Sequence, residues 1–256
     1  MKVEAYGDHP LQTIKVFHFE EVKARTVVFI HGGAWRDPRN TYDDFDDMAS
    51  RFIKSDAKFN LIGINYRLSP EFKHPTHLID VVLALRHIVM HYGRRIDMVG
   101  HSVGATLIMQ LLNAEQFLQP YKVVMDHDVF AALVFVKQIV WKNIFLIDGI
   151  YDIVQLVKEY PLYTLFVNDA FTDVNDYADA SQLSNSKIKF HKLLPKIFVL
   201  QSVEDELLSL HQTNLLVEHL RERNLTFSLE TDRWGQHEQV YRNNAVAELI
   251  IDKCKK

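Results

Sequence analysis

Short apolar runs alternate with longer amphipathic stretches along most of the 256-residue chain. The runs are rich in β-branched and aromatic residues, and most are continuously apolar, as in parallel strands that are covered on both faces. They predict strands at Ile14–Phe19, Thr26–His31, Asn60–Asn65, Ile96–Gly100, Asn143–Asp148, Lys196–Gln201 and Thr226–Glu230.

Helical periodicity fills the intervals between these runs, which indicates an α/β fold with a mostly parallel sheet flanked by helices. The chain length suits one domain, residues 1–256, because α/β folds of this size are common as single units. The stretch 153–194 is less regular and carries Pro161 and several aromatic residues, so we expect it to form a small cap insertion. Helices are expected at Asp43–Ile53, Leu78–Tyr92, Ala105–Asn113, Val123–Trp141, Leu208–Arg221 and Ala245–Cys254.

The composition narrows the class of function. Apolar residues make up 48% of the chain and charged residues 24%, and the net charge is −4 without a dense basic cluster. We therefore expect a small-molecule substrate and no nucleic-acid partner. The chain has neither the layout of a signal peptide nor an apolar stretch of membrane-spanning length, so we expect a cytoplasmic protein that does not bind membranes.

Three features invite a chemical interpretation but favour a structural one. The acidic run Tyr42–Asp47 is typical of a solvent-facing first turn of a helix rather than of a metal site. The single cysteine, Cys254, can form neither an internal disulfide nor a thiolate metal cluster, and its position in a polar tail argues against catalysis. His87 and His91 have helical spacing without the HExxH pattern, so we predict no metal and no cofactor.

The segment Gly100-His101-Ser102-Val103-Gly104 matches the G-x-S-x-G pattern of a nucleophile elbow. A predicted strand precedes it and a predicted helix follows it, which is the context that makes the pattern specific. A tight turn of this kind exposes the serine hydroxyl and needs very small residues two positions before and after it. Ser102 is therefore the candidate nucleophile.

A glycine-rich loop, His31-Gly32-Gly33-Ala34-Trp35, follows an early predicted strand. Attack on a carbonyl places negative charge on its oxygen, which preorganised N–H groups stabilise. We expect these donors, the oxyanion hole, to be the backbone amides of Gly33, Ala34 and Val103. The loop and the elbow together are the two halves of a hydrolase signature.

The general base and its acid partner should follow the nucleophile in the chain order Ser, Asp or Glu, His. His237 lies between the last predicted strand and the last predicted helix, where that base is expected. Asp205 follows the penultimate strand and is the favoured acid on topology, with Glu204 and Glu206 as close rivals. Asp148, at the end of an earlier strand, is a further alternative.

The chain resembles the α/β-hydrolase type of kynurenine formamidase (arylformamidase), in particular the fungal form, over nearly its whole length. The motifs that carry the resemblance are 31–35 (HGGAW), 65–70 (NYRLSP), 99–105 (VGHSVGA), 146–151 (LIDGIY), 205–208 (DELL) and 235–237 (GQH). HGGxW and GHSxGA also occur in related esterases, so the Asp-Gly-Ile-Tyr segment and the collinearity favour the formamidase.

The resemblance implies a serine hydrolase that cleaves a linear amide, N-formyl-L-kynurenine, to L-kynurenine and formate, in tryptophan breakdown towards NAD. It maps a catalytic triad onto Ser102, Asp205 and His237. Trp35, Tyr66, Tyr151 or Phe166 could supply aromatic surface for the substrate, although core packing explains each equally well. The oligomeric state is left open between a monomer and a homodimer.

Two other functions stay open at this stage. A general small-acyl carboxylesterase would have the same motifs, because specificity resides in the pocket and not in the fold. A non-catalytic binding protein on a hydrolase fold is the second alternative, although all three triad residues are present in the sequence.

Overall fold

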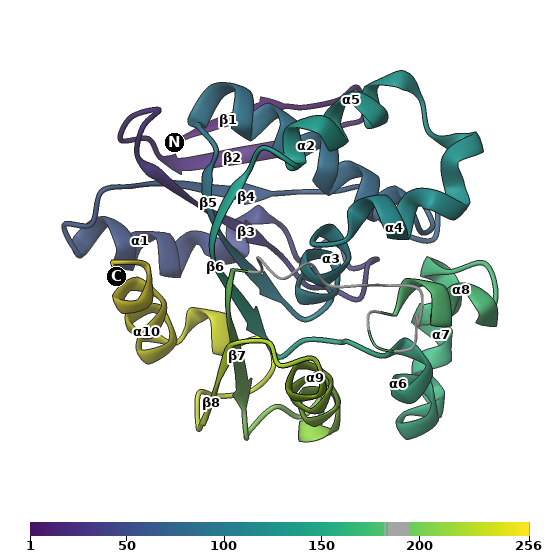
Figure 1. The fold of residues 1–256 in the computed structure, drawn as a ribbon. Helices are drawn as coiled ribbons and strands as arrows, with labels where there is room; N and C mark the ends of the chain where they lie inside the picture. Colours follow the sequence, from purple (N-terminus) through teal and green to yellow (C-terminus); the bar gives the residue numbers. More distant parts are fainter. Residues whose placement is uncertain (182, 184–194, 256) are drawn as a thin grey trace.

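The computed structural model describes residues 1–181, 183 and 195–255 (Figure 1). In this part of the chain, eight strands form one twisted sheet in the order β1-β2-β4-β3-β5-β6-β7-β8. The first two strands pair antiparallel, and β2 also runs antiparallel to β4, whereas all remaining neighbours are parallel. The strands are β1 (Lys2–Ala5), β2 (Thr13–His18), β3 (Arg25–Ile30), β4 (Phe59–Ile64), β5 (Arg95–His101), β6 (Val140–Ile147), β7 (Lys196–Ser202) and β8 (Phe227–Asp232).

Helices cover both faces of the sheet. The α-helices are α1 (Asp46–Lys54), α2 (Thr76–Tyr92), α3 (Val103–Leu111), α4 (Ala114–Leu118), α5 (His127–Val136), α6 (Ile153–Glu159), α7 (Thr164–Ala170), α8 (Val174–Ala180), α9 (Leu210–Glu222) and α10 (Asn244–Cys254). Short 3₁₀ helices are η1 (Tyr42–Phe45), η2 (Gln119–Val124), η3 (Pro161–Tyr163) and η4 (Val240–Arg242).

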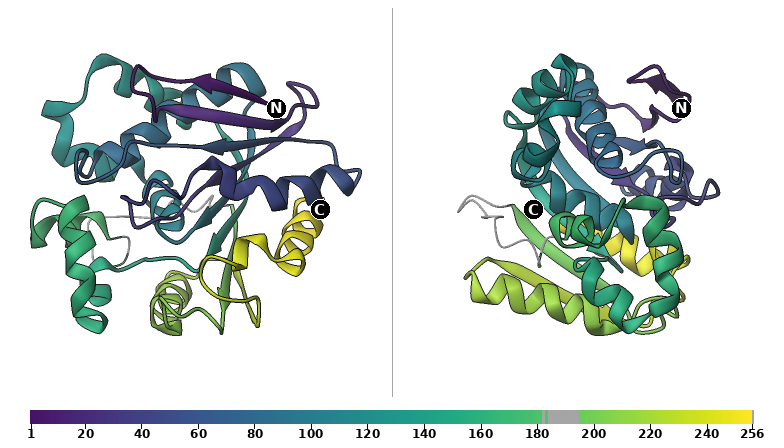
Figure 2. Two further views of the ribbon diagram at one scale, coloured as in Figure 1. Left: turned by 180° about the vertical axis from the view of Figure 1, so that it is seen from behind. Right: turned by 90° about the vertical axis from the view of Figure 1, so that its right-hand side faces the viewer.

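The central strands are apolar throughout because each of their two faces lies against a layer of helices. In β3, Val28 and Ile30 belong to the core under α2, α3, α5 and α9, whereas Val27 and Phe29 belong to the core under α1 and α10. Successive side chains of a strand point to opposite faces, so both faces need apolar residues. Figures 1 and 2 show the two layers, with α1 and α10 packed together on one face.

Helices α6, α7 and α8 form a separate group on the side of the molecule away from α1 and α10 (Figure 1). Their apolar residues, among them Ile153, Leu156 and Val167, share a third core with Trp35 and Val103 of the two predicted catalytic motifs. These helices make up the described part of the expected cap 153–194, and residues 182 and 184–194 lie outside the described residues. The single domain and the cap stay predictions.

The seven predicted strands are confirmed to within a few residues, and so is the mostly parallel sheet. The helix expected at Val123–Trp141 is wrong at both ends. Its first residues belong to η2, which contains Pro120, and its last two residues open β6. A continuous apolar run does not distinguish a helix from a buried strand, so the pattern gave no boundary at Val140.

Two structural interpretations of polar residues also need correction. Asp44, in the acidic run, does not face solvent: it is buried and accepts hydrogen bonds from Asn40 and Arg242. Cys254 is not in an exposed tail, because it is fully buried at the last turn of α10.

Among the helices of the described residues, none combines the length and the apolar character that crossing a bilayer requires.

Candidate active site

The nucleophile elbow lies between β5 and α3. Ser102 has φ 54° and ψ −120°, a conformation that residues with a Cβ rarely adopt, and its amide donates to the carbonyl of Ile147 at 2.9 Å. A Cβ on Gly104 would overlap the carbonyl oxygen of Ile30, and one on Gly100 would lie 2.7 Å from the carbonyl oxygen of Gly104. The steric need for glycine on both sides of the serine is therefore confirmed.

The loop after β3 turns back through three successive residues with positive φ: Gly33 at 87°, Ala34 at 51° and Trp35 at 60°. The amides of Arg36 and Asp37 both donate to the carbonyl of Gly33, at 2.9 and 2.8 Å, which closes the turn. Gly33 and Ala34 line the same cavity as Ser102, which is the placement an oxyanion hole requires. Val103 is the first residue of α3, directly after the nucleophile.

Buried side chains support this loop from below. The hydroxyl of Tyr66 donates to the carbonyls of Gly32 and His31, at 3.0 and 3.2 Å. The rings of His31 and Tyr66 are stacked with their centroids 4.4 Å apart. Burial lowers the pKa of His31 to about 4, so it is neutral at physiological pH. His31 and Tyr66 therefore hold the backbone of the glycine loop in position.

His237 reaches the site from the loop after β8, where Gly235 has φ 97°. Its Nδ1 lies 2.8 Å from Oδ2 of Asp205, and both side chains are almost fully buried. Asp205 also accepts from the amides of Leu207 and Leu208, at 2.8 and 2.9 Å, and from Nε2 of Gln201 at 3.2 Å. These donors fix the carboxylate beside the imidazole.

The neighbouring acids hold the backbone of the histidine loop and not its imidazole. Glu206 accepts from the amide of His237 at 2.9 Å, and Glu204 accepts from the amide of Gly235 at 3.1 Å. Glu204 also forms an ion pair with Arg233 at 3.3 Å. The structure thus brings Asp205, rather than either glutamate, to the imidazole.

The pKa of His237 reflects two opposed effects. Burial disfavours the imidazolium, but the hydrogen bond to Asp205 and the charge of that carboxylate outweigh burial and raise the pKa of His237 above its usual value. Asp148 behaves differently. Burial, reinforced by the negative charge of Asp205, raises the pKa of Asp148 well above its usual range.

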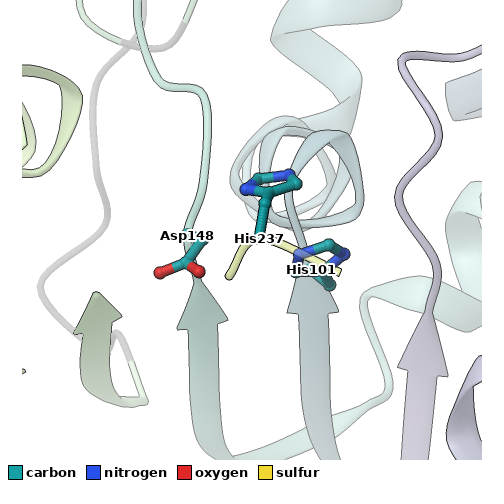
Figure 3. A group of neighbouring side chains, drawn as sticks. All are labelled: His101, Asp148 and His237. Carbon is teal, nitrogen blue, oxygen red and sulfur yellow. The ribbon is translucent and has the colours of Figure 1, made fainter. Parts of the chain in front are cut away.

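Asp148 and His101 lie at the carboxyl ends of the neighbouring strands β6 and β5, with His237 close to both (Figure 3). One nitrogen or oxygen atom from each of these three residues lies within 4.8 Å of the other two. Among the described residues, they therefore form a group whose geometry could hold a metal ion. Nδ1 of His237 is engaged by Asp205, at 2.8 Å. Burial also lowers the pKa of His101 well below its usual value.

A cavity of about 540 Å³ opens over Ser102 and His237. That volume is typical of a small-molecule site. One part of its wall is apolar or aromatic, formed by Ile150, Tyr163, Phe166, Leu207 and Leu208. The remaining wall is polar and comes from the loop after β3, from η1 and from the segment after His237: Arg36, Asp37, Arg39, Asn40, Asp44, Glu238, Tyr241 and Arg242.

Most of the aromatic residues expected at the substrate lie elsewhere. Trp35, Tyr66 and Tyr151 are at most 1% exposed and do not line the cavity, so the expectation that they contact the substrate is corrected. Trp35 instead packs edge-on against Phe171 in the core under the cap helices. Of the expected aromatic residues, Phe166 does reach the cavity wall, where it neighbours Tyr163.

Sequence reasoning missed the polar wall of the cavity. Three of its members, Glu238, Tyr241 and Arg242, follow His237 within five residues, so their closeness to the predicted base was a usable signal. Asp44 had no such signal, because its partner Arg242 is almost two hundred positions away in the chain.

The sheet topology, the elbow and the paired His237 and Asp205 define an α/β-hydrolase. Residues 14–220 match the family described as BD-FAE. Among solved structures, a truncated carbohydrate esterase from gut microbiota covers the whole chain and 97% of its own, at a TM-score of 0.73 and 15% identity. Esterase B from Lactobacillus rhamnosis covers 99% of this chain and 84% of its own, at a TM-score of 0.70 and 13% identity. Such low identities show the fold alone.

Curated relatives are much more similar. The kynurenine formamidase of Scheffersomyces stipitis is 41% identical over 98% of both chains, and that of Meyerozyma guilliermondii is 42% identical over 98% of this chain and 92% of its own. The Saccharomyces cerevisiae kynurenine formamidase is 37% identical over 93% of each chain. The chain belongs to the fungal kynurenine formamidase family of hydrolases.

Proposed function

We propose that this hydrolase cleaves N-formyl-L-kynurenine to L-kynurenine and formate, with Ser102 as nucleophile, His237 as general base and acid, and Asp205 as the carboxylate partner of His237. The names of its relatives supply the substrate. The observation that carries the mechanism is the 2.8 Å contact between Nδ1 of His237 and Asp205, beside a cavity that Ser102 and His237 both line. The proposed place of the reaction is tryptophan degradation towards NAD.

In the first half of the reaction, Nε2 of His237 takes the proton of the Ser102 hydroxyl, and Oγ attacks the formyl carbon. The carbonyl oxygen becomes an oxyanion and binds the amides of Gly33, Ala34 and Val103. His237 then gives its proton to the aryl nitrogen as the C–N bond breaks. L-Kynurenine leaves, and the formyl group stays on Ser102 as an ester.

In the second half, His237 takes a proton from water, and the resulting hydroxide attacks the formyl ester. A second oxyanion forms on the same amides and collapses, which breaks the bond to Oγ. His237 returns the proton to Ser102, and formate leaves. Asp205 holds the imidazole in the tautomer that presents Nε2 to the serine and stabilises the imidazolium in both halves.

The wall of the cavity suits the leaving group better than the acyl group. A formyl group is very small, so most of the binding energy must come from the aryl amino acid. Phe166, Tyr163, Leu207 and Leu208 offer an apolar surface for the aryl ring. Tyr163 is itself fixed by a hydrogen bond from its hydroxyl to the carbonyl of Leu207 at 2.8 Å.

The decisive experiment compares kcat/KM of the purified protein on N-formyl-L-kynurenine and on p-nitrophenyl acetate, with and without EDTA. We expect a clear preference for N-formyl-L-kynurenine and full activity in EDTA. The matched variant is Ser102→Ala, which should keep the circular dichroism spectrum and lose all but about one part in a thousand of the activity.

Three outcomes would contradict the proposal. Equal or better turnover of p-nitrophenyl acetate would make the protein a general esterase. Activity lost in EDTA and restored by zinc or manganese would replace the serine mechanism with a metal-dependent one. Substantial turnover by a folded Ser102→Ala variant would remove Ser102 from its role.

A further inference from the structure

Six charged side chains line the polar part of the cavity: Arg36, Asp37, Arg39, Asp44, Glu238 and Arg242. Charges at the wall of a binding cavity are either neutralised by one another or available to a ligand. The pattern of ion pairs among them therefore indicates which charge the cavity offers to a substrate.

Five of the six have a partner of opposite charge. Arg36 pairs with Asp169 of α7 at 2.6 Å, Arg39 pairs with Asp37 at 2.6 Å, and Arg242 pairs with the buried Asp44 at 3.0 Å. Arg242 also lies 3.6 Å from Asp47. All three guanidinium groups at this wall are thus already matched by carboxylates.

Glu238 is different, because it forms no ion pair with any other described residue. Its carboxylate is nevertheless held in place: Oε2 accepts from Nδ2 of Asn40 at 2.9 Å and from the hydroxyl of Tyr241 at 2.8 Å. Both donors are buried and line the same cavity. Glu238 is exposed at the cavity wall and follows His237 in the chain, so its fixed carboxylate is open to a cation that enters the cavity.

We propose that Glu238 binds the α-ammonium group of the leaving amino acid and so selects substrates that carry an amino-acid arm. This inference rests on the proposed function and extends it to the part of the substrate that does not react. The substrate then lies with its aryl ring against Phe166 and its ammonium group at Glu238.

The test uses three formamides that share the reacting bond. N-Formyl-L-kynurenine has the whole amino-acid arm, 4-(2-formamidophenyl)-4-oxobutanoic acid lacks only the ammonium group, and formanilide lacks the arm. The test variant is Glu238→Gln, which keeps an oxygen to accept from Asn40 and Tyr241 but removes the charge. The matched control is Glu248→Gln, which makes the same chemical change at an exposed position of α10 that does not line the cavity.

We expect Glu238→Gln to lower kcat/KM for N-formyl-L-kynurenine about tenfold, mainly through KM, as for a lost hydrogen bond to a charged group. Its kcat/KM for the two substrates without an ammonium group should stay within twofold of wild type, which also shows that the variant is folded and that His237 still works. Glu248→Gln should leave kcat/KM for all three substrates unchanged.

An equal loss on all three substrates would overturn the inference, because Glu238 would then act on the loop or on His237. An unchanged kcat/KM for N-formyl-L-kynurenine would overturn it as well. Failure of the proposed function has a different signature: the wild-type protein itself would show no preference for N-formyl-L-kynurenine over formanilide.

Discussion

Two buried aspartates stand at the ends of the neighbouring strands β6 and β7, and they differ in the donors around them. The side chain of Asp205 accepts four hydrogen bonds, including one from His237. Asp148 accepts one on Oδ1, from the amide of Ser202 at 2.8 Å, and its buried Oδ2 has no partner among the described residues.

The comparison shows that burial alone does not decide the role of a carboxyl group. Burial, followed by the negative charge of Asp205, raises the pKa of Asp148, and its single donor does not offset them. The donors around Asp205 instead fix its carboxylate beside Nδ1 of His237. We infer that Asp205 serves as the partner of His237 and that Asp148 keeps its proton to a higher pH than an exposed aspartate does.

The largest effect is expected for Asp205→Asn, which should lower kcat by a factor of about 10³ to 10⁴. An amide can donate to Nδ1 and hold the imidazole in the wrong tautomer. The magnitude is borrowed from the same change in a serine protease. Steady-state kinetics on N-formyl-L-kynurenine measure it, with the circular dichroism spectrum as a check of folding. A loss below tenfold would remove Asp205 from the triad.

The next effect concerns stability and is specific to Asp148. The pKa of Asp148 is raised in the folded state. The unfolded chain therefore releases the Asp148 proton at a lower pH, about 4, than the folded protein does. The wild-type protein is therefore destabilised progressively above that pH, and Asp148→Asn should relieve this destabilisation at pH 8 but not at pH 4. Urea unfolding at both pH values measures the difference. A variant less stable than wild type at pH 8 would contradict it.

A smaller effect is expected in the pH profile of kcat/KM. The base must be neutral to accept a proton, so activity should rise with pH through the pKa of His237, which lies above 6.5. In Asp205→Asn the hydrogen bond and the charge that contribute most to raising the pKa of His237 are lost, so the acid limb of the residual activity should move to lower pH. An unmoved limb would mean that another group titrates there.

The smallest effect is expected for Asp148→Asn on activity at neutral pH. An amide resembles the protonated carboxyl group in shape and charge, so kcat/KM should stay within about threefold of wild type. The same assay as for Asp205→Asn provides the direct comparison. If instead Asp148→Asn proved crippling and Asp205→Asn mild, the roles of the two aspartates would be exchanged.

The sequence was sufficient for those parts of the molecule that depend on local patterns. The continuous apolar runs located the central strands, and the glycines around Ser102 located the elbow, because strand-to-helix turns have a steric requirement that is visible in the sequence. Strand β1, by contrast, was not predicted. Its residues Lys2–Ala5 are mostly exposed and lie at the sheet edge, so they carry no apolar pattern.

Features that depend on distant residues could not be predicted in the same way. The choice between Asp205 and its rivals depends on which carboxylate reaches Nδ1, and three acids in a row look alike in the sequence. The core positions of Trp35, Tyr66 and Tyr151 depend on which side of the loop each ring turns to. An aromatic residue within a catalytic motif is as often a support for the motif as a contact for the substrate.

The backbone of Ser102 has a consequence for how this protein can change over time. A residue with a side chain at φ 54° and ψ −120° costs about 1–3 kcal/mol, which glycine would largely avoid. Glycine would itself cost about 0.4–1 kcal/mol of stability, because it gives the unfolded chain more conformational freedom, and this cost is smaller than the strain that it relieves. Selection for stability alone would therefore replace the nucleophile, and only selection for turnover retains a serine at this position. A lineage released from the need for catalysis could gain stability by the same substitution that ends its activity.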